Sequence, residues 1–175
     1  MPGLQLMDLF RSEHGLSLSL SHCRQLVVVA LAREPLGVDC EATGRQRNWQ
    51  GIADCFFSAA EADSIRNAST ENREELFLKH WVLKESHIKA IRGSIFGDLN
   101  RLVLETDGSE TRLSIPGGLD SPWWAWQGQF AACSLGLRGS GAKVPALEFF
   151  ESRGLMCGDF APCDDFVTGN YLAAS

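Results

Sequence analysis

The chain has 175 residues, which is enough for one ordinary domain or for two small lobes that share a core. Hydrophobic residues make up 45 % and charged residues 22 %, as in soluble globular proteins, and no stretch has the roughly 20 apolar residues that a membrane-spanning helix needs. The net charge of −6 argues against a general nucleic-acid binder, which carries a basic excess, so a phosphate ligand or an acidic partner would need a local patch of Lys and Arg.

The N-terminus and the cysteines give the expected location. Residues 1–10 contain Asp8 and have neither a basic region nor a cleavable small-residue site, so we expect no signal peptide and a cytoplasmic protein. The six cysteines form no C-x-x-C pair, which favours free, mostly buried thiols over a zinc site. Cys157 and Cys163 are close enough in sequence to pair under oxidation.

The first quarter of the chain predicts a short helix and three short strands. The helix is expected around residues 5–12. Residues 16–20 alternate apolar and polar side chains with period two, which is typical of a strand. Residues 25–31 are rich in β-branched side chains and predict a buried strand. A further short strand is expected at residues 37–41.

Three helices are predicted next. The first covers residues 47–57. Ser58 and Glu61 have the side chains of a capping box and should open the second. The clearest pattern is the third, over residues 72–91, because this stretch lacks Gly and Pro, has glutamates at its start and ends before a glycine.

From residue 99 onward the pattern changes to strands and loops. Dipeptides such as Asp-Gly between two apolar runs favour hairpins. The expected elements are strands at 99–106 and 110–115 around Asp107-Gly108, strands at 123–126 and 130–137 around Gln127-Gly128, a loop at 136–141, a short helix at 146–153 and a polar, glycine-rich, acidic tail at 154–175.

Asp39 and Glu41 are the first candidates for chemistry. They are two residues apart on a predicted strand, so both carboxylates leave the same face while Val38 and Cys40 point into the core. Two neighbouring carboxylates repel each other unless a cation lies between them or one binds a proton. Taken alone, such a pair is usually a solvated strand edge, and the metal-site interpretation needs further support.

The predicted helix over residues 72–91 carries the second candidates. Phe77, Trp81, Glu85 and Lys89 are spaced by four and form one row along the helix. The aromatic half of the row can anchor in the core, which leaves a carboxylate and an ammonium at the edge of the core. On their own, Glu85 and Lys89 would be interpreted as a surface ion pair worth roughly 0.3–0.5 kcal/mol.

His22 is the third candidate and follows Ser21 at the head of the hydrophobic strand. A single histidine in such a place is more often a surface or hydrogen-bonded residue than a ligand. None of these features defines a site by itself.

Their order along the chain is more specific. A Ser-His pair precedes a β-branched strand, and Gly-Val-Asp-x-Glu, Phe-Phe-Ser-x-x-Glu and Trp-x-x-Lys-Glu-Ser-x-x-Lys follow it. This arrangement resembles the 4′-phosphopantetheinyl transferase superfamily, in its Sfp-like branch, from about Leu18 to about Leu137. The resemblance implies an α+β fold in which antiparallel sheets pack against a long helix. It also implies a Mg²⁺-dependent enzyme that transfers 4′-phosphopantetheine from coenzyme A to a serine of an apo acyl or peptidyl carrier protein, releasing adenosine 3′,5′-bisphosphate.

The resemblance assigns roles residue by residue. Asp39, Glu41 and Glu85 match the metal ligands, and Glu85 is also a candidate base. Lys89 matches the lysine that contacts the coenzyme A pyrophosphate and stabilises the leaving group. The remaining coenzyme contacts that the resemblance implies are Ser21, His22 and Lys84, of which Lys84 has no specified role.

The chain departs from the two-lobed Sfp pattern at its beginning, because only 38 residues precede Asp39. We therefore interpret residues 1–34 as the remnant of a first lobe that is largely missing, residues 35–145 as the main lobe with the metal site, and residues 146–175 as a C-terminal extension. Three explanations are open: a shortened product of a longer gene, self-association that covers the missing surface, or a relative that binds a partner without catalysis.

Two rival functions follow from the same residues. The first is a non-catalytic module that binds a carrier protein or coenzyme A. The second is a different metal-dependent phosphoryl-transfer enzyme or hydrolase that uses the same carboxylates. Arg45 and Arg47, just beyond the metal-ligand strand, could meet an acidic carrier helix or lie in a solvated loop.

Overall fold

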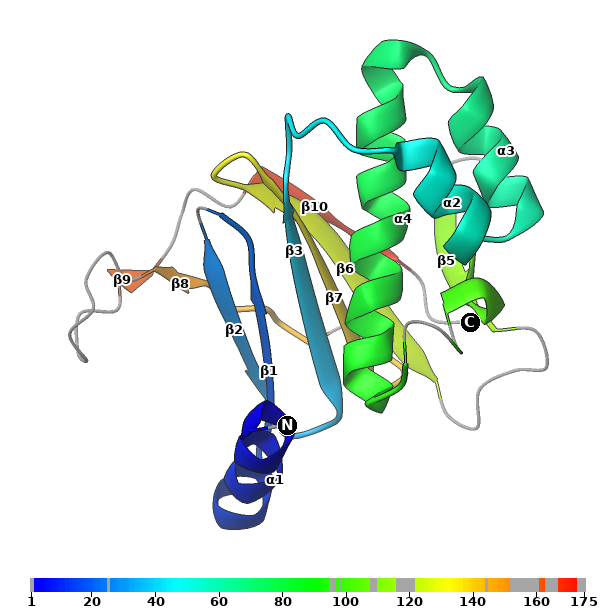
Figure 1. Ribbon diagram of the computed structural model, residues 1–175. Helices are drawn as coiled ribbons and strands as arrows, with labels where there is room; N and C mark the ends of the chain where they lie inside the picture. The colour runs from blue at the N-terminus through cyan, green and yellow to red at the C-terminus, as the bar shows by residue number, and fades with distance from the viewer. Residues whose placement is uncertain are drawn as a thin grey trace.

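The fold is α+β and is built on one antiparallel sheet, as the computed structural model shows (Figure 1). The sheet has the strand order β10 (Val167–Leu172), β6 (Trp123–Phe130), β7 (Cys133–Ser140) and β3 (Leu36–Ala42). The long helix α4 (Thr70–Ile91) lies across one face of it and packs mainly on β3 and β7. The structure describes residues 2–24, 26–94, 97, 99–107, 110–115, 122–143, 145–151, 161–162 and 167–172.

Local sequence signals explain where α4 begins and ends. The side chain of Ser69 accepts a hydrogen bond from the backbone N–H of Asn72 and caps the N-terminus. Arg92 adopts a left-handed conformation with φ of 55° and ends the helix before Gly93. The helix predicted over residues 72–91 is confirmed and begins two residues earlier, at Thr70.

Two glycines allow α4 to approach the sheet closely. A Cβ atom at Gly37 would lie 1.9 Å from the Ser86 carbonyl oxygen, and one at Gly136 would lie 2.6 Å from the Val82 carbonyl oxygen. Both glycines therefore face the helix backbone directly. Because side chains alternate along a strand, the other residues on the Gly37 face of β3 also point toward α4.

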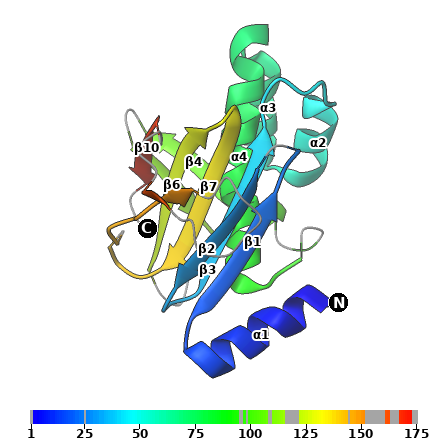
Figure 2. The ribbon, with the colours of Figure 1, turned by 90° about the vertical axis from the view of Figure 1, so that its left-hand side faces the viewer.

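A hairpin of β1 (Ser17–His22) and β2 (Val27–Ala32) runs beside β3 (Figure 2). The described hydrogen bonds between β1 and β3 come from serine side chains: the hydroxyl of Ser19 accepts from the Val38 N–H and that of Ser21 from the Cys40 N–H. The strand predicted at residues 16–20 is confirmed, and its serine face is the buried one.

The prediction that the strand at residues 25–31 is buried is wrong. Val27, Val29 and Leu31 are 64 %, 54 % and 54 % exposed, and only Ala30 of β2 is buried. The reason is that β2 pairs with β1 alone in the described part of the chain, so one of its faces packs on the core and the other has no layer over it.

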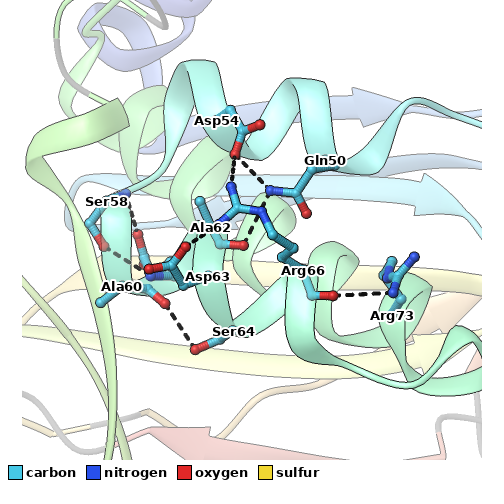
Figure 3. Close-up of polar contacts among 10 residues, drawn as sticks. Gln50, Asp54, Ser58, Ala60, Ala62, Asp63, Ser64, Arg66 and Arg73 are labelled. Atoms are coloured by element: carbon cyan, nitrogen blue, oxygen red, sulfur yellow. Dashed lines mark hydrogen bonds and ion pairs between the residues drawn. The ribbon is translucent and has the colours of Figure 1, made fainter.

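Helices α2 (Trp49–Phe56) and α3 (Ala59–Asn67) pack together beside α4, and α1 (Pro2–His14) lies against β1. The predicted helices at residues 5–12 and 47–57 are thus confirmed, and so is the predicted capping box that begins α3. Figure 3 shows how α2 and α3 are joined: the carboxylate of Asp54 accepts hydrogen bonds from Gln50 and, at 2.9 Å, from Arg66. No helix in the described ranges is both long enough and apolar enough to cross a membrane.

The second half of the chain agrees only in part with the elements predicted from the sequence. Strands β4 (Val103–Asp107) and β5 (Glu110–Ser114) form the predicted hairpin after a 3-10 turn at Leu99–Arg101, and the two residues between them lie outside the described part. The predicted turn at Gln127-Gly128 is wrong, because both residues lie inside β6. The chain turns instead at Ala131 and Ala132, which both have positive φ.

Three further expectations for this half are overturned or extended. The predicted loop at 136–141 is mostly part of β7, since Gly136 lies opposite the α4 backbone and belongs to the sheet. The predicted helix at 146–153 is wrong for its described residues, which contain no helix and form β8 (Phe150–Glu151), paired with β9 (Ala161–Pro162). The expected tail contributes β10, which pairs with β6, while Cys157 and Cys163 lie outside the described residues.

The core has three clusters, of which the second and third include residues of α4. The first lies between the hairpin and the sheet and contains Val38, Cys40 and Leu135. The second lies between α4, β4 and β5, and the third between α2, α3 and the first half of α4. In the third cluster the ring of Phe77 stacks on that of Trp81 at 5.7 Å, so the aromatic half of the predicted row does anchor in the core.

Candidate functional site

Asp39 and Glu41 lie on the face of β3 that points toward α4. Asp39 pairs with Gly136 of β7, and both sit on the same face as Gly37, which contacts the helix backbone. Val38 and Cys40 point the other way and are 0 % and 2 % exposed, as predicted. The strand alternation expected from the sequence is therefore present, and it aims both carboxylates at the helix that carries Glu85.

The structure brings Glu85 into the electrostatic field of the two strand carboxylates. Burial, followed by the negative charge of Asp39 and with a smaller contribution from Glu41, raises the pKa of Glu85 from 4.5 to about 7. The ammonium of Lys89 acts in the opposite direction and lowers it. A pKa near neutrality is expected for a carboxyl group that is buried beside other carboxylates.

Lys89 is the cation that neutralises Asp39 in the structure. Its ammonium lies 2.7 Å from Oδ1 of Asp39 and also donates to the hydroxyl of Ser21 at 3.0 Å. The Ser21 hydroxyl in turn donates to the same Asp39 oxygen at 2.8 Å. These three side chains, from α4, β1 and β3, form one polar cluster. The second carboxylate oxygen of Asp39 is buried and has no hydrogen-bond partner within the described structure.

Glu41 has a basic partner of its own. Nη2 of Arg47 lies 2.5 Å from its carboxylate, and the guanidinium of Arg47 stacks over the ring of Trp49 at 5.3 Å. Arg47, for which sequence reasoning left a carrier contact and a solvated loop open, therefore contacts the predicted site itself. Among the described side chains, no group of three or more His, Cys, Asp or Glu residues is arranged to hold a metal ion.

Lys84 lies away from this cluster, in the interior. Its side chain is 0 % exposed, and its ammonium lies 2.7 Å from the carboxylate of Glu61 and 4.6 Å from the ring centre of Phe57. Glu61 also accepts hydrogen bonds from the backbone N–H groups of Ser58 and Leu104. Burial alone would raise the pKa of Glu61, but Lys84 and these hydrogen bonds hold it below its usual value, so the pair is ionised.

The sequence-predicted site residues thus fall into three groups. Asp39, Glu41, Glu85 and Lys89 come together between β3 and α4, and Ser21 joins them through its hydroxyl. His22 ends β1 with an exposed side chain, and Lys84 is enclosed with Glu61.

Sequence reasoning missed the direct contact of Ser21 with Asp39 and the pairing of Glu61 with Lys84. The first had a signal in the Ser-x-Ser-x-Ser pattern of β1. For the second, the sequence indicated that Glu61 caps a helix, but it gave no sign that the same carboxylate pairs with Lys84.

Comparison with known proteins identifies the family of the chain. The family model described as the 4′-phosphopantetheinyl transferase superfamily matches residues 35–137. The 4′-phosphopantetheinyl transferase HetI of Nostoc sp. is 29 % identical over 80 residues, which are 45 % of this chain and 34 % of that protein. The 4′-phosphopantetheinyl transferase gsp of Aneurinibacillus migulanus is 27 % identical over 93 residues, 53 % of this chain and 38 % of that protein.

The chain belongs to the 4′-phosphopantetheinyl transferase superfamily, because the family model covers more than half of it. The matched part spans little more than a third of the length of these two relatives. Among solved structures, the crystal structure of holo-[acyl-carrier-protein] synthase from Thermotoga maritima aligns with a TM-score of 0.47 and 15 % identity, over 67 % of this chain and 68 % of that one.

Proposed function

We propose that the protein transfers 4′-phosphopantetheine from coenzyme A to a serine of an apo acyl or peptidyl carrier protein in a Mg²⁺-dependent reaction, as in the Sfp-like branch of the superfamily. The products are the holo carrier and adenosine 3′,5′-bisphosphate. The observation that carries the proposal is the convergence of Asp39, Glu41 and Glu85 in one electrostatic field, on the two elements that belong to the matched family region.

The ligand type suits a hard divalent cation, but the present arrangement of the three carboxylates, with Lys89 and Arg47 on two of them, does not hold one. Mg²⁺ prefers carboxylate oxygens and retains several waters, and Asp39 offers a buried carboxylate oxygen without a hydrogen-bond partner in the described structure. A bound cation would lower the raised pKa of Glu85, because it would favour the ionised form of that carboxylate. Asp39, Glu41 and Glu85 would hold the ion, with Lys89 and Arg47 released from their present partners. The ion would supply charge neutralisation at the coenzyme A pyrophosphate.

The side chains of the chain would perform the proton and charge handling. Glu85, which a bound cation would keep ionised, would accept the proton of the attacking serine hydroxyl. Lys89, one turn further along α4, would contact the pyrophosphate and stabilise the departing oxygens. His22, exposed at the end of β1, would contact the nucleotide part of the coenzyme.

Ser21 and Lys84 take positioning roles in this proposal. Ser21 would keep Asp39 and Lys89 aligned, since its hydroxyl contacts both of them. The contacts of Lys84 favour a role through Glu61 over a direct coenzyme contact, because its ammonium is enclosed by the core.

The test is transfer to apo carrier proteins from fatty-acid, polyketide and nonribosomal-peptide synthesis, followed by the intact mass of each carrier. We expect one carrier to gain a single phosphopantetheine group with Mg²⁺ present and none after chelation. Asp39→Asn and Glu85→Gln should abolish the gain, whereas Glu75→Gln, at an exposed position of the same helix, should leave it intact. No gain on any carrier, or full gain with Glu85→Gln, would remove the proposal.

A second candidate is supported by the ion pairs of the structure. Because Lys89 and Arg47 already neutralise two of the three carboxylates, the protein could bind a carrier protein or coenzyme A without catalysing transfer. Calorimetric titration separates the two: a folded protein that binds coenzyme A or the carrier but does not bind Mg²⁺ would favour this candidate.

A further inference from the structure

Two thiols far apart in the sequence face each other at the junction of the hairpin and the sheet. Cys23 follows β1, and Cys133 is the first residue of β7. Their sulfur atoms lie 3.2 Å apart although 110 positions separate them in the chain. A disulfide bond is about 2.05 Å long, so the two sulfurs would need to approach by little more than an ångström.

The backbone around both cysteines is held by hydrogen bonds. The N–H of Cys23 donates to the Leu26 carbonyl at 2.9 Å, which closes the turn between β1 and β2. Cys133 pairs with Ala42 of β3 and with Phe130 of β6. The distance between the two sulfur atoms is therefore fixed by hydrogen-bonded backbone at both cysteines.

The two thiols differ in their access to solvent. Cys23 is partly exposed, whereas Cys133 is buried. Burial, together with the neighbouring Cys23, raises the pKa of Cys133 to about 12, so Cys133 remains protonated and its thiol can also donate to the Ala131 carbonyl at 3.5 Å. An oxidant arriving from solvent therefore meets Cys23 first.

We propose that Cys23 and Cys133 form a redox modification site that reacts with a peroxide and closes to a disulfide between the β1–β2 hairpin and β7. In the first step the sulfur of Cys23 attacks one peroxide oxygen, the O–O bond breaks, and a sulfenic acid and one water form. In the second step the sulfur of Cys133 attacks that of Cys23, the S–O bond breaks, and the proton of Cys133 leaves with the hydroxyl as a second water. Two electrons pass from the thiols to the peroxide.

The bridge would act where the hairpin meets the sheet. In the described structure, β1 is hydrogen-bonded to β3 through the side chains of Ser19 and Ser21 and not through a backbone ladder. A covalent bond two residues beyond Ser21 would hold the hairpin against the sheet and limit its local opening. Closing so long a loop also restricts the unfolded chain strongly.

Cys40 and Cys55 provide the internal comparisons. Cys40 is buried, and its burial, with a smaller contribution from the nearby Cys23, raises its pKa to about 12. It is therefore the thiol that competes with Cys133 for Cys23. Cys55 is exposed on α2 and would be oxidised without a partner. If geometry decides which thiols are joined, Cys23 must form its disulfide with Cys133 and not with Cys40. Cys55 must then form none.

The test oxidises the reduced 175-residue chain with hydrogen peroxide and maps the bridges by mass spectrometry of unreduced peptides. We expect a loss of about 2 Da, a Cys23–Cys133 peptide pair, and a higher urea midpoint that dithiothreitol reverses. The bridge should vanish in Cys23→Ser and in Cys133→Ala and persist in Cys55→Ser and Cys40→Ser. Cys23→Ser, at a partly exposed position, keeps the test valid if Cys133→Ala does not fold.

Three results would overturn the proposal. They are a bridge from Cys23 to Cys40, a bridge confined to Cys157 and Cys163, and oxygen addition to Cys23 without any bridge. The inference does not depend on the transferase activity, since every readout is a mass or an unfolding midpoint.

Discussion

The ammonium of Lys89 lies 2.7 Å from the carboxylate of Asp39 and ties α4 to β3 at the centre of the candidate site. The same two elements carry Glu85 and Glu41, and the negative charge of Glu41 contributes to raising the pKa of Glu85. Lys89 is the cation paired with Asp39, while Arg47 is paired with Glu41. The position of Lys89 means that it competes with any divalent cation for Asp39.

Replacing Lys89 should therefore separate metal binding from catalysis. Lys89→Met removes the competing charge, so we expect the Mg²⁺ affinity of the free protein to rise by about tenfold. Transfer should fall by about 100-fold or more, because the leaving oxygens lose their cation. Calorimetric Mg²⁺ titration and carrier mass measure the two effects, and Lys143→Met, at an exposed position, is the control. A weaker Mg²⁺ affinity in Lys89→Met would contradict the competition.

The pKa of Glu85 makes the stability of the metal-free protein depend on pH. The pKa is about 7 in the folded state against an ordinary value of 4.5, so the folded protein binds more protons between these values. The free energy of unfolding should then fall as the pH rises from about 4.5 to about 7, by on the order of 2 kcal/mol after allowance for solvent screening.

Urea unfolding at pH 5 and pH 8, with a chelator present, measures this fall. Glu85→Gln cannot titrate and should lose most of it, whereas Glu75→Gln, at an exposed position of the same helix, should retain it. An equal fall in the free energy of unfolding for the Glu85→Gln variant and the native chain would show that Glu85 does not cause the pH dependence.

Local signals made the long helix and the metal-ligand strand predictable. Ser69 and Gly93 bracket α4, and Ser58 and Glu61 form the expected capping box. Alternation along β3 places Asp39 on the face opposite Val38 and Cys40. Each of these depends on residues within a few positions of one another, so periodicity and capping chemistry suffice.

What could not be predicted depends on distant partners. The β-branched pattern of β2 predicts a strand, but whether a second layer covers Val27 and Val29 is decided by tertiary structure. Gly128 looked like a turn residue, yet it belongs to β6, where a Cβ atom would lie 2.4 Å from the Trp126 ring. At the site, the partner of Lys84 is 23 residues away in sequence, and its pairing could not be read from the motif.

Removing only one member of the buried pair of Glu61 and Lys84 should destabilise the fold. Lys84→Met leaves a buried carboxylate without its cation, and Glu61→Gln leaves a buried ammonium without its anion, so each should lower the free energy of unfolding by about 3–5 kcal/mol. The double variant removes both charges while Gln retains an acceptor for a backbone N–H. We therefore expect it to be more stable than either single variant, as measured by urea unfolding. Additive losses would show that the two side chains act independently.

Gly37 should be the most sensitive position for the spacing between β3 and α4. Gly37→Ala places a Cβ atom 1.9 Å from the Ser86 carbonyl oxygen and 2.6 Å from the Ala90 nitrogen, and backbone atoms cannot move aside as a flexible side chain can. The helix must then shift away from the strand. We expect a loss of about 3 kcal/mol or more in the free energy of unfolding, as for overpacked cores.

Gly44→Ala is the matched control, because Gly44 has φ of 73° and no atom within 4 Å of a Cβ there. It should cost only about 1–2 kcal/mol from backbone strain. If the variant at Gly37 remains folded, the shift of α4 should also separate Glu85 from Asp39 and Glu41. The pH dependence of its stability should then be smaller than that of the native chain. A Gly37→Ala protein with native stability and native pH dependence would show that α4 does not rest on this strand.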